Sequence, residues 1–302
     1  MLTGLLAMPR ILLADDAAAP ESGLTLLEVV SIASWVLAPL SVLVLVRMRF
    51  WSRFVPPAGP LPTPWRLSAT MGLGLYLASI FLGAAGAHLA GRLVPEDAGL
   101  VLRSAGMMWG MVLGTTVAAF LGALAWTSRR QPEGSGPLVD LRTSMLAACF
   151  AAALLIPMVQ ATSSLGQWLQ NLITGAEPSP LGHETLRLMA DSTGTPAWWL
   201  MATAAVIGAP FIEEVVYRGF LQQSIRKVGL GPIWASILVG GFFALMHVSA
   251  LPADTRIAGL SGLLVLGVGL GLLREWTGRL DACILVHAIF NVFNLLLAMT
   301  VE

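Results

Sequence analysis

Eight apolar segments of about 20 residues are the feature that most constrains this chain. They lie at about 26–46, 67–90, 100–127, 143–162, 197–220, 232–249, 257–273 and 282–299. A helix of about 20 apolar residues crosses the hydrocarbon core of a bilayer, and in lipid only helices and closed barrels satisfy their backbone polar groups. The sequence therefore predicts an all-α polytopic membrane protein with about eight transmembrane helices.

Composition supports this fold class. Of the 302 residues, 56% are apolar and 11% are charged, and the mean hydropathy is +0.79. A soluble domain of this size could hardly bury so much apolar surface, whereas a lipid bilayer accepts it. The formal net charge is zero, so there is no electrostatic case for nucleic acid as a partner.

We divide the chain into three regions: an N-terminal tail at 1–25, a region of four helices plus an external loop at 26–196, and a C-terminal transmembrane region at 197–299, whose polar residues are described below. The tail holds a weakly apolar run that Pro9 and Arg10 interrupt. That run is a poor signal peptide, and an extramembrane tail fits it better. In the external loop we expect a short amphipathic helix near 181–191.

Basic residues predict the orientation of the helices. One alternating set of loops and helix ends carries eleven of them: Arg47, Arg49, Arg53, Arg66, Arg129, Arg130, Arg142, Arg226, Lys227, Arg274 and Arg279. The opposite set carries five: Arg10, Arg92, Arg103, Arg187 and Arg256. Loops rich in Lys and Arg stay in the cytoplasm. We therefore expect both termini outside, in a bacterial plasma membrane.

Small residues on the third segment predict close helix packing. Gly106, Gly110, Gly114, Ala118 and Gly122 recur every four residues, a spacing that lets two helix backbones approach. We expect the partner to be another helix of the same chain, and the sequence leaves the oligomeric state open. Cys149 and Cys283 lie in apolar segments, which predicts two buried free thiols.

Polar and ionisable side chains gather in the last four segments, where they predict a functional site. The fifth segment carries Glu213, Glu214 and Arg218, the sixth His247, and the eighth His287 and Asn291. Such residues are costly in a bilayer, so an intramembrane cluster of them is a functional-site hypothesis by default. Carboxylates, imidazoles, an amide and a guanidinium are the residue types of a hydrolase.

Helical spacing gives the two glutamates different roles. Glu214 and Arg218 are four residues apart, which suits an ion pair. Glu213 points about 100° away on the helix, so it is available as a general base. His287 and Asn291 project together and can donate to one developing oxyanion. In the alternative interpretation, both glutamates lie in water beyond the end of the helix.

The rise along each helix predicts the depth of this cluster. At about 1.5 Å per residue, Glu213 and His247 lie roughly 20 and 24 Å from the turn at 229–231, but His287 lies only about 9 Å from Asp281. These depths agree if the fifth and sixth helices protrude by about 10 Å, which would place the site about 10–15 Å below the cytoplasmic surface.

Three motifs resemble those of a known family. Glu-Glu-x-x-x-Arg at 213–218, Phe-x-x-x-His at 243–247 and His-x-x-x-Asn at 287–291 are similar to the motifs of the CPBP intramembrane proteases (CAAX protease and bacteriocin-processing, Abi-like). This family includes the Ras-converting CAAX endopeptidase. The resemblance covers about 197–298 and implies an eight-helix fold with proteolysis in a water-accessible cavity. The implied substrate is a membrane-bound peptide or protein, such as a prenylated C-terminus.

The resemblance also implies roles by position. Glu213 and His247 would activate the attacking water, His287 and Asn291 would stabilise the oxyanion, and Glu214 and Arg218 would hold the site together. If the enzyme depended on a metal, Glu213, His247 and His287 would be the zinc ligands. We expect no cofactor, because no helix presents two histidines and Asn291 suits an oxyanion hole better.

Two other functions remain open at this point. One is a non-catalytic membrane scaffold or bacteriocin-immunity protein that retains the motif residues. The other is a transporter that uses the charges as a proton relay, although the repeated halves that are common in transporters are not visible here.

Overall fold

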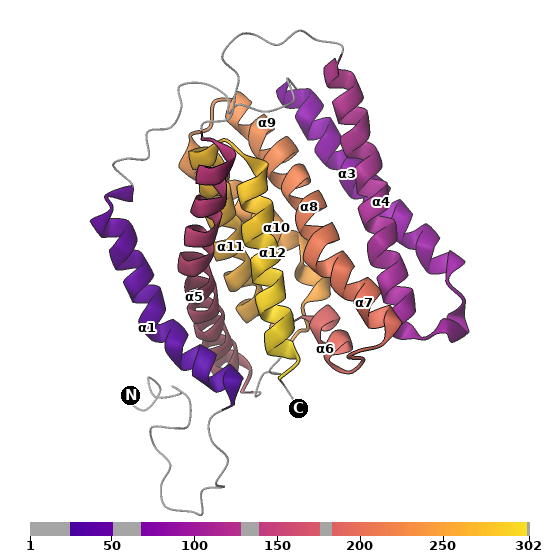
Figure 1. The fold of residues 1–302 in the computed structure, drawn as a ribbon, viewed down its shortest axis with the longest axis horizontal. Coiled ribbons are helices and arrows are strands. Elements are labelled where there is room, and N and C mark those ends of the chain that lie inside the picture. Colours follow the sequence, from indigo (N-terminus) through magenta and orange to yellow (C-terminus); the bar gives the residue numbers. More distant parts are fainter. Residues whose placement is uncertain (1–24, 51–67, 128–138, 176–182, 301–302) are drawn as a thin grey trace, which may run out of the picture.

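The computed structural model describes residues 25–50, 68–127, 139–175 and 183–300 (Figure 1). All regular elements in this part of the chain are helical, and eight helices are long and apolar enough to cross a membrane. The predicted fold class is confirmed, and the chain is an integral membrane protein. Of the predicted tail at 1–25, residues 1–24 lie outside the described residues.

The N-terminal region contains four spanning helices: α1 (Leu26–Arg47), α3 (Ala69–Leu93), α4 (Leu100–Thr127) and α5 (Leu141–Thr174). α1 begins with a capping box, in which Thr25 and Glu28 satisfy each other's backbone N–H groups. α5 begins at Asp140, whose carboxylate accepts the N–H of Thr143 at 2.8 Å. α1 packs on α5, whereas α3 and α4 form a pair on the other side of the bundle (Figure 1).

α5 continues twelve residues past the predicted end at 162. The predicted helix end was wrong because the polar residues after 162, including Gln170, belong to the helix and not to a loop. The Gln170 amide donates to the Ala253 carbonyl at 2.6 Å, and its carbonyl accepts the N–H of Ile257 at 2.8 Å. These contacts with residues 253–257 satisfy the polar side chain, so the helix persists to Gly175, which ends it in a left-handed conformation.

The glycine ladder of α4 packs against α3, as predicted. A Cβ atom added at Gly110 would collide with the Gly86 carbonyl, and one added at Gly114 would collide with the Leu82 carbonyl. The backbones therefore touch at these points. The prediction of packing within the chain is confirmed.

The short helix α6 (Glu184–Ala190) lies within the predicted range. Met189 is fully buried against Trp198 and Leu295, and Arg187 lies 3.5 Å from the Asp254 carboxylate. α6 is thereby fixed at the same end of the bundle as the last turn of the C-terminal helix, which ends at Ala298 (Figure 1). We call this end the α6 face; it comprises α6, residues 248–255, the start of α1 and the end of α12.

The fifth spanning helix is not a uniform α-helix. It consists of α7 (Pro196–Thr203), the π turn η4 (Ala204–Gly208), α8 (Ala209–Glu214), a second π turn η5 (Val215–Leu221) and α9 (Gln222–Lys227). Thr195 caps its start by accepting the Trp198 N–H, and Pro196 takes the first helical position. π turns are rare and often occur at functional sites. The two here flank the glutamate pair.

Three further elements complete the bundle: α10 (Pro232–Met246), α11 (Arg256–Thr277) and α12 (Leu280–Ala298). A 3-10 turn, η6 (Val248–Ala250), follows α10. Gly240 of α10 and Gly267 of α11 let these helices approach, because a Cβ on Gly267 would lie 2.8 Å from the Gly240 Cα atom. Exposed large apolar side chains on the outer helices, such as Leu113 and Phe120, suit a surface in contact with lipid.

The two cysteines differ from each other. Cys283 is buried, and its thiol donates to the Leu270 carbonyl at 3.4 Å. Cys149 is exposed, so the prediction of two buried thiols is wrong for this residue. An apolar segment alone does not show which side faces lipid.

Candidate active site

The adjacent glutamates at the end of α8 point in different directions, as their spacing predicts. The side chain of Glu214 is fully buried, whereas that of Glu213 is 18% exposed and lines a cavity. The alternative in which both lie in water beyond the helix end is therefore wrong.

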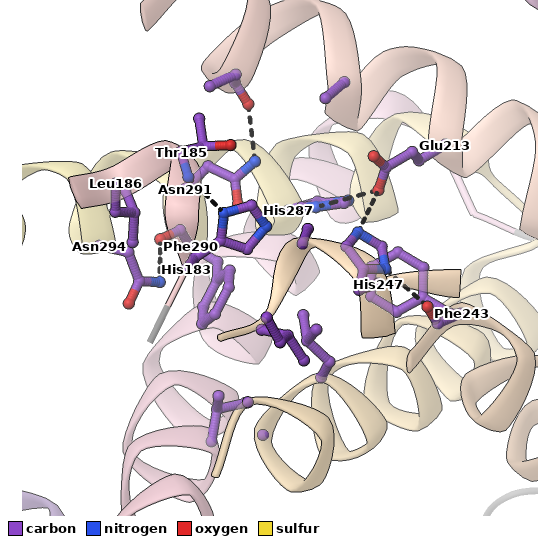
Figure 2. Close-up of a pocket in the computed structure, with 18 of the residues that line it drawn as sticks. His183, Thr185, Leu186, Glu213, Phe243, His247, His287, Phe290, Asn291 and Asn294 are labelled. Atoms are coloured by element: carbon purple, nitrogen blue, oxygen red, sulfur yellow. Dashed lines mark hydrogen bonds and ion pairs between the residues drawn. The ribbon is translucent and has the colours of Figure 1, made fainter. Parts of the chain in front are cut away.

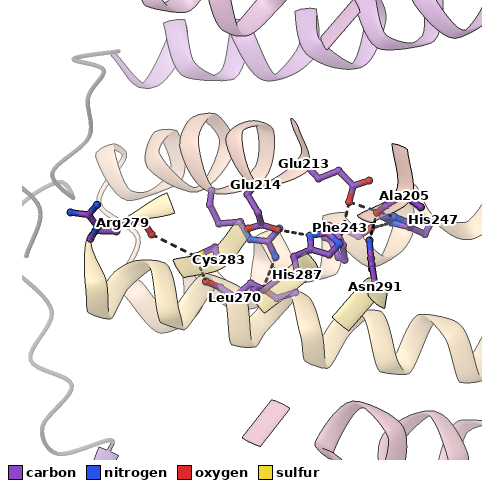
Figure 3. A network of polar contacts seen from close by, with 12 residues as sticks. Ala205, Glu213, Glu214, Phe243, His247, Leu270, Arg279, Cys283, His287 and Asn291 are labelled. Carbon is purple, nitrogen blue, oxygen red and sulfur yellow. Dashed lines mark hydrogen bonds and ion pairs between the residues drawn. The ribbon is translucent and has the colours of Figure 1, made fainter. Parts of the chain in front are cut away.

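Glu214 is held by a cation and an imidazole, and Figure 3 shows its contact with His287. Arg218 Nη1 donates to Glu214 Oε1 at 3.0 Å, and His287 Nδ1 lies 2.9 Å from the same oxygen. Arg218 Nη2 also donates to the Gly267 carbonyl at 3.0 Å, and its guanidinium lies 5.0 Å from the centre of the Phe243 ring. These contacts join the fifth spanning helix to α10, α11 and α12.

His247 and His287 face Glu213 with the same ring nitrogen. The distance from Glu213 Oε2 is 3.9 Å to His247 Nε2 and 3.9 Å to His287 Nε2. His247 Nδ1 lies 2.7 Å from the Phe243 carbonyl, and His287 Nδ1 contacts the Glu214 carboxylate. Carbonyls and carboxylates only accept, so each Nδ1 carries a proton. In its neutral form each ring therefore turns the Nε2 lone pair toward Glu213.

Three acceptor atoms thus converge on one point. At 3.9 Å they are too far apart for direct hydrogen bonds, but a water molecule between them fits this spacing. A water molecule has two protons, whereas the site has three acceptors. When one of the two imidazoles is protonated, it donates to the water oxygen and only two acceptors remain. A carboxylate and an imidazole that both accept from one water would orient it for attack.

The spacing of the same three side chains is wider than that of the ligands around a tetrahedral zinc ion. Tetrahedral zinc with bonds of about 2.0–2.1 Å requires ligand atoms about 3.3 Å apart, and the Glu213 to histidine distances are 3.9 Å. Among the described residues, no group of three or more His, Cys, Asp or Glu is placed to hold a metal ion.

Asn291 lies one helical turn after His287 and also lines the cavity. Its Nδ2 donates to the Ala205 carbonyl in η4 at 2.8 Å. A π turn pairs each carbonyl with the N–H five residues later, and the residue five after Ala205 is Pro210, which has no N–H. The Asn291 amide therefore satisfies a carbonyl that the helix cannot. Its second N–H is free to act in the cavity.

The structure thus brings all six predicted residues together, with one difference from the predicted geometry. His287 and Asn291 were expected to donate side by side. Because His287 Nδ1 is directed at Glu214, its Nε2 can donate to an oxyanion only when the ring carries a second proton.

The cavity has a volume of about 900 Å³ and two different ends. Its polar end holds Glu213, His247, His287 and Asn291 (Figure 2). The rest is largely apolar, with lining side chains that include Ile80, Met108, Met111, Val159 and Leu263. The predicted depth of the site below the cytoplasmic surface stays a prediction. The cavity itself extends toward the α6 face, a direction that the calculation from the helical rise did not indicate.

His183 is a cavity residue that sequence reasoning missed. Its Nδ1 accepts the N–H of Thr185 at 3.2 Å at the start of α6. Burial, together with the nearby His247, lowers the pKa of His183 to about 4. The neutral ring therefore has its proton on Nε2 and is a hydrogen-bond donor. No motif marks this residue, and only the packing of α6 brings it to the cavity.

Sequence reasoning also missed a pair of residues in the cavity wall between α5 and α12. Gln160 Nε2 donates to Asn294 Oδ1 at 3.3 Å. Asn294 follows Asn291 by three residues, so the helical period of α12 was the signal that could have revealed it.

The fold and the site together define a class, the polytopic membrane protein with a hydrolase-like polar cluster inside its helix bundle. Residues 195–293 match the family described as type II CAAX prenyl endopeptidase Rce1-like. This region contains all six predicted site residues, and the match confirms the predicted resemblance. The family is a protease family, so peptidase activity is supported at that level.

Two curated relatives match in part. The chain is 32% identical over 104 residues to uncharacterized protein YyaK of Bacillus subtilis (strain 168), covering 32% of this chain and 33% of that protein. It is 27% identical over 114 residues to putative chloride channel protein ClcB-like of Ralstonia nicotianae (strain ATCC BAA-1114 / GMI1000), covering 38% of this chain and 26% of that protein. No solved structure matches the chain significantly.

Proposed function

We propose that this protein is an intramembrane endopeptidase that hydrolyses a peptide bond in a membrane-bound peptide or protein by means of activated water. The observation that carries the proposal is the convergence of Glu213 Oε2 with His247 Nε2 and His287 Nε2, at 3.9 Å each, in a cavity inside the helix bundle. The family match at 195–293 supports the same reaction class.

The proposed reaction begins with a water held by Glu213 and His247. Its oxygen attacks the carbonyl carbon of the peptide while one of its protons passes to the Glu213 carboxylate. The negative charge that develops on the carbonyl oxygen is stabilised by protonated His287 and by the free N–H of Asn291. The C–N bond then breaks, and Glu213 returns the proton to the leaving amine.

Glu214 and Arg218 act indirectly in this scheme. The buried Glu214 carboxylate accepts from His287 Nδ1 and so fixes the direction in which Nε2 of the ring points. Arg218 neutralises Glu214 and fixes it to the Gly267 carbonyl. We propose that both residues position His287.

The test is to map new protein termini by mass spectrometry in membranes that contain wild-type protein or Glu213→Gln at equal abundance. Glu96→Gln, an equivalent change in an exposed external turn, is the matched control. We expect cleavage to fall about 10³-fold in Glu213→Gln, because the water loses its base, and to persist in Glu96→Gln. Identical termini with all three proteins would refute the proposal and favour the scaffold or transport functions.

A zinc-dependent form of the same protease is tested separately. We propose chemistry without a metal, so 1,10-phenanthroline should leave cleavage unchanged. Inhibition that added zinc reverses would instead assign Glu213, His247 and His287 as ligands.

We further propose that the protein lies in a bacterial plasma membrane with both termini outside. The support is the excess of basic residues, eleven against five, on the loops of the opposite face.

A further inference from the structure

We infer that the cavity takes its substrate from the extracytoplasmic side. The substrate class is then a membrane-anchored peptide or protein whose scissile bond lies on that side of the bilayer. This inference rests on the proposed endopeptidase function for its chemistry, but the face from which the cavity is entered can be tested without any activity.

The lining of the cavity shows where it leads. From Glu213 it passes residues at the ends of several helices, all at the α6 face: Leu27 and Glu28, His183 and Thr185, Ser249 and Leu251, and Leu297 and Ala298. His247 itself directly follows α10 and precedes the η6 turn. The cavity therefore joins the site to the loops of this face.

The opposite end of the cavity is closed by aromatic rings. Tyr217 and Phe243 form its floor, with their ring centres 5.3 Å apart in an edge-to-face arrangement. Tyr76 of α3 packs on Tyr217 in the same manner at 5.8 Å. All three rings are buried. Rings packed in this way leave no passage for a peptide chain.

Beyond this floor, buried polar contacts seal α9 against α11. Gln222 Nε2 donates to the Glu275 carboxylate at 2.8 Å, and Arg226 Nε donates to the same carboxylate at 3.1 Å. Gln222 and Glu275 are almost inaccessible. A route from this end to Glu213 would require these charged contacts to separate, which is costly in a buried site.

The sealed end is also the basic end. Arg226 and Lys227 at the end of α9, and Arg274 near the end of α11, belong to the set of eleven basic residues, whereas the α6 face belongs to the set of five. By the distribution of basic residues the sealed end is cytoplasmic and the α6 face is extracytoplasmic.

This placement narrows the substrate class. A lipid-modified C-terminus that stays in the cytoplasm would meet the sealed end, whereas a translocated segment near the outer surface would meet the entrance. The apolar lining beside the site, which includes Met108 and Met111, suits apolar side chains of varied shape, because Met is flexible and adaptable.

The first experiment labels single cysteines with a membrane-impermeant maleimide. Ser249→Cys reports on the cavity entrance, and Val228→Cys, in the exposed turn after α9, is the matched control at the sealed end. Both are made in a Cys149→Ser background, since Cys283 is buried. We expect Ser249→Cys to react in intact spheroplasts and Val228→Cys to react only in inverted vesicles. The reverse pattern, or labelling of both positions from both sides, would overturn the inference.

The second experiment measures cleavage in the labelled proteins. A bulky maleimide on Ser249→Cys should reduce cleavage at least tenfold by blocking the entrance, and the same label on Val228→Cys should not. New termini should map to extracytoplasmic segments of the substrates, and termini in cytoplasmic segments would overturn the inference while leaving the endopeptidase proposal intact. A terminome that does not respond to Glu213→Gln would count against the endopeptidase proposal alone.

Discussion

Replacing Arg218 by methionine would remove the guanidinium that neutralises buried Glu214 while keeping a long apolar side chain in its place. Both charged side chains are fully buried, and the ion-pair distance is 3.0 Å. At an effective dielectric constant of about 20, this separation corresponds to an attraction of roughly 5 kcal/mol. Breaking a buried pair by removing one partner typically costs about 3–5 kcal/mol, because the other charge is left uncompensated.

The assay is thermal unfolding in one detergent, followed by the fluorescence of the ten tryptophans. At about 2–4 °C per kcal/mol for a chain of a few hundred residues, Arg218→Met should lower the melting temperature by about 10 °C. The matched control is the double variant Glu214→Gln/Arg218→Met, which removes the orphan charge as well. We expect it to recover at least half of the loss, as coupled neighbours do in a double-mutant cycle.

Two results would refute this reasoning. One is an Arg218→Met protein that melts within about 2 °C of wild type, far less than the loss of a buried partner predicts. The other is a double variant whose loss equals the sum of the losses in Arg218→Met and in Glu214→Gln alone, because additivity would show that the residues do not interact.

Three further predictions address other parts of the molecule. Asn291→Ala should lower kcat by about 10²–10³-fold, the cost of one oxyanion donor, and near-normal turnover would remove that role. Gly114→Leu should destabilise the protein, because its Cβ would meet the Leu82 carbonyl, and an unchanged melting temperature would contradict the α3–α4 contact. The third concerns pH: burial lowers the pKa of His183 to about 4, so its neutral form stabilises the fold above about pH 6.5 and that stability is lost as the pH falls toward 4. Between pH 7.5 and pH 5, wild type should lose up to about 2 kcal/mol more than His183→Gln, and equal losses in melting experiments would show that α6 does not bury this ring.

Local sequence rules predicted much of this fold and site. The lengths of the eight apolar segments were sufficient to predict eight spanning helices, because the thickness of the bilayer fixes the length that each helix must have. The Glu214–Arg218 pair also followed from spacing, since residues four apart on a helix are neighbours whatever the rest of the fold does. The α4 glycines predicted a close contact for the same local reason.

Features that depend on distant contacts were not predictable. α5 extends to Thr174 because Gln170 bonds to Ala253 and to Ile257 in the first turn of α11, and nothing near Gln170 in sequence indicates these partners. The protonated nitrogen of His287 follows from its contact with Glu214, 73 residues away. His183 enters the cavity only through the packing of α6. Each of these results from tertiary packing rather than from local pattern.

The length of α5 has a consequence for how the protein responds to its lipid. Its 34 residues correspond to about 51 Å, against a hydrocarbon core of about 30 Å. A helix that exceeds the bilayer in this way tilts, protrudes or thickens the lipid around it. Because Val159, Gln160, Ser163 and Gln167 of this helix form one wall of the cavity, a change in tilt would alter the width of the cavity. Acyl-chain length is therefore a variable that any measurement of this protein in lipid should hold constant.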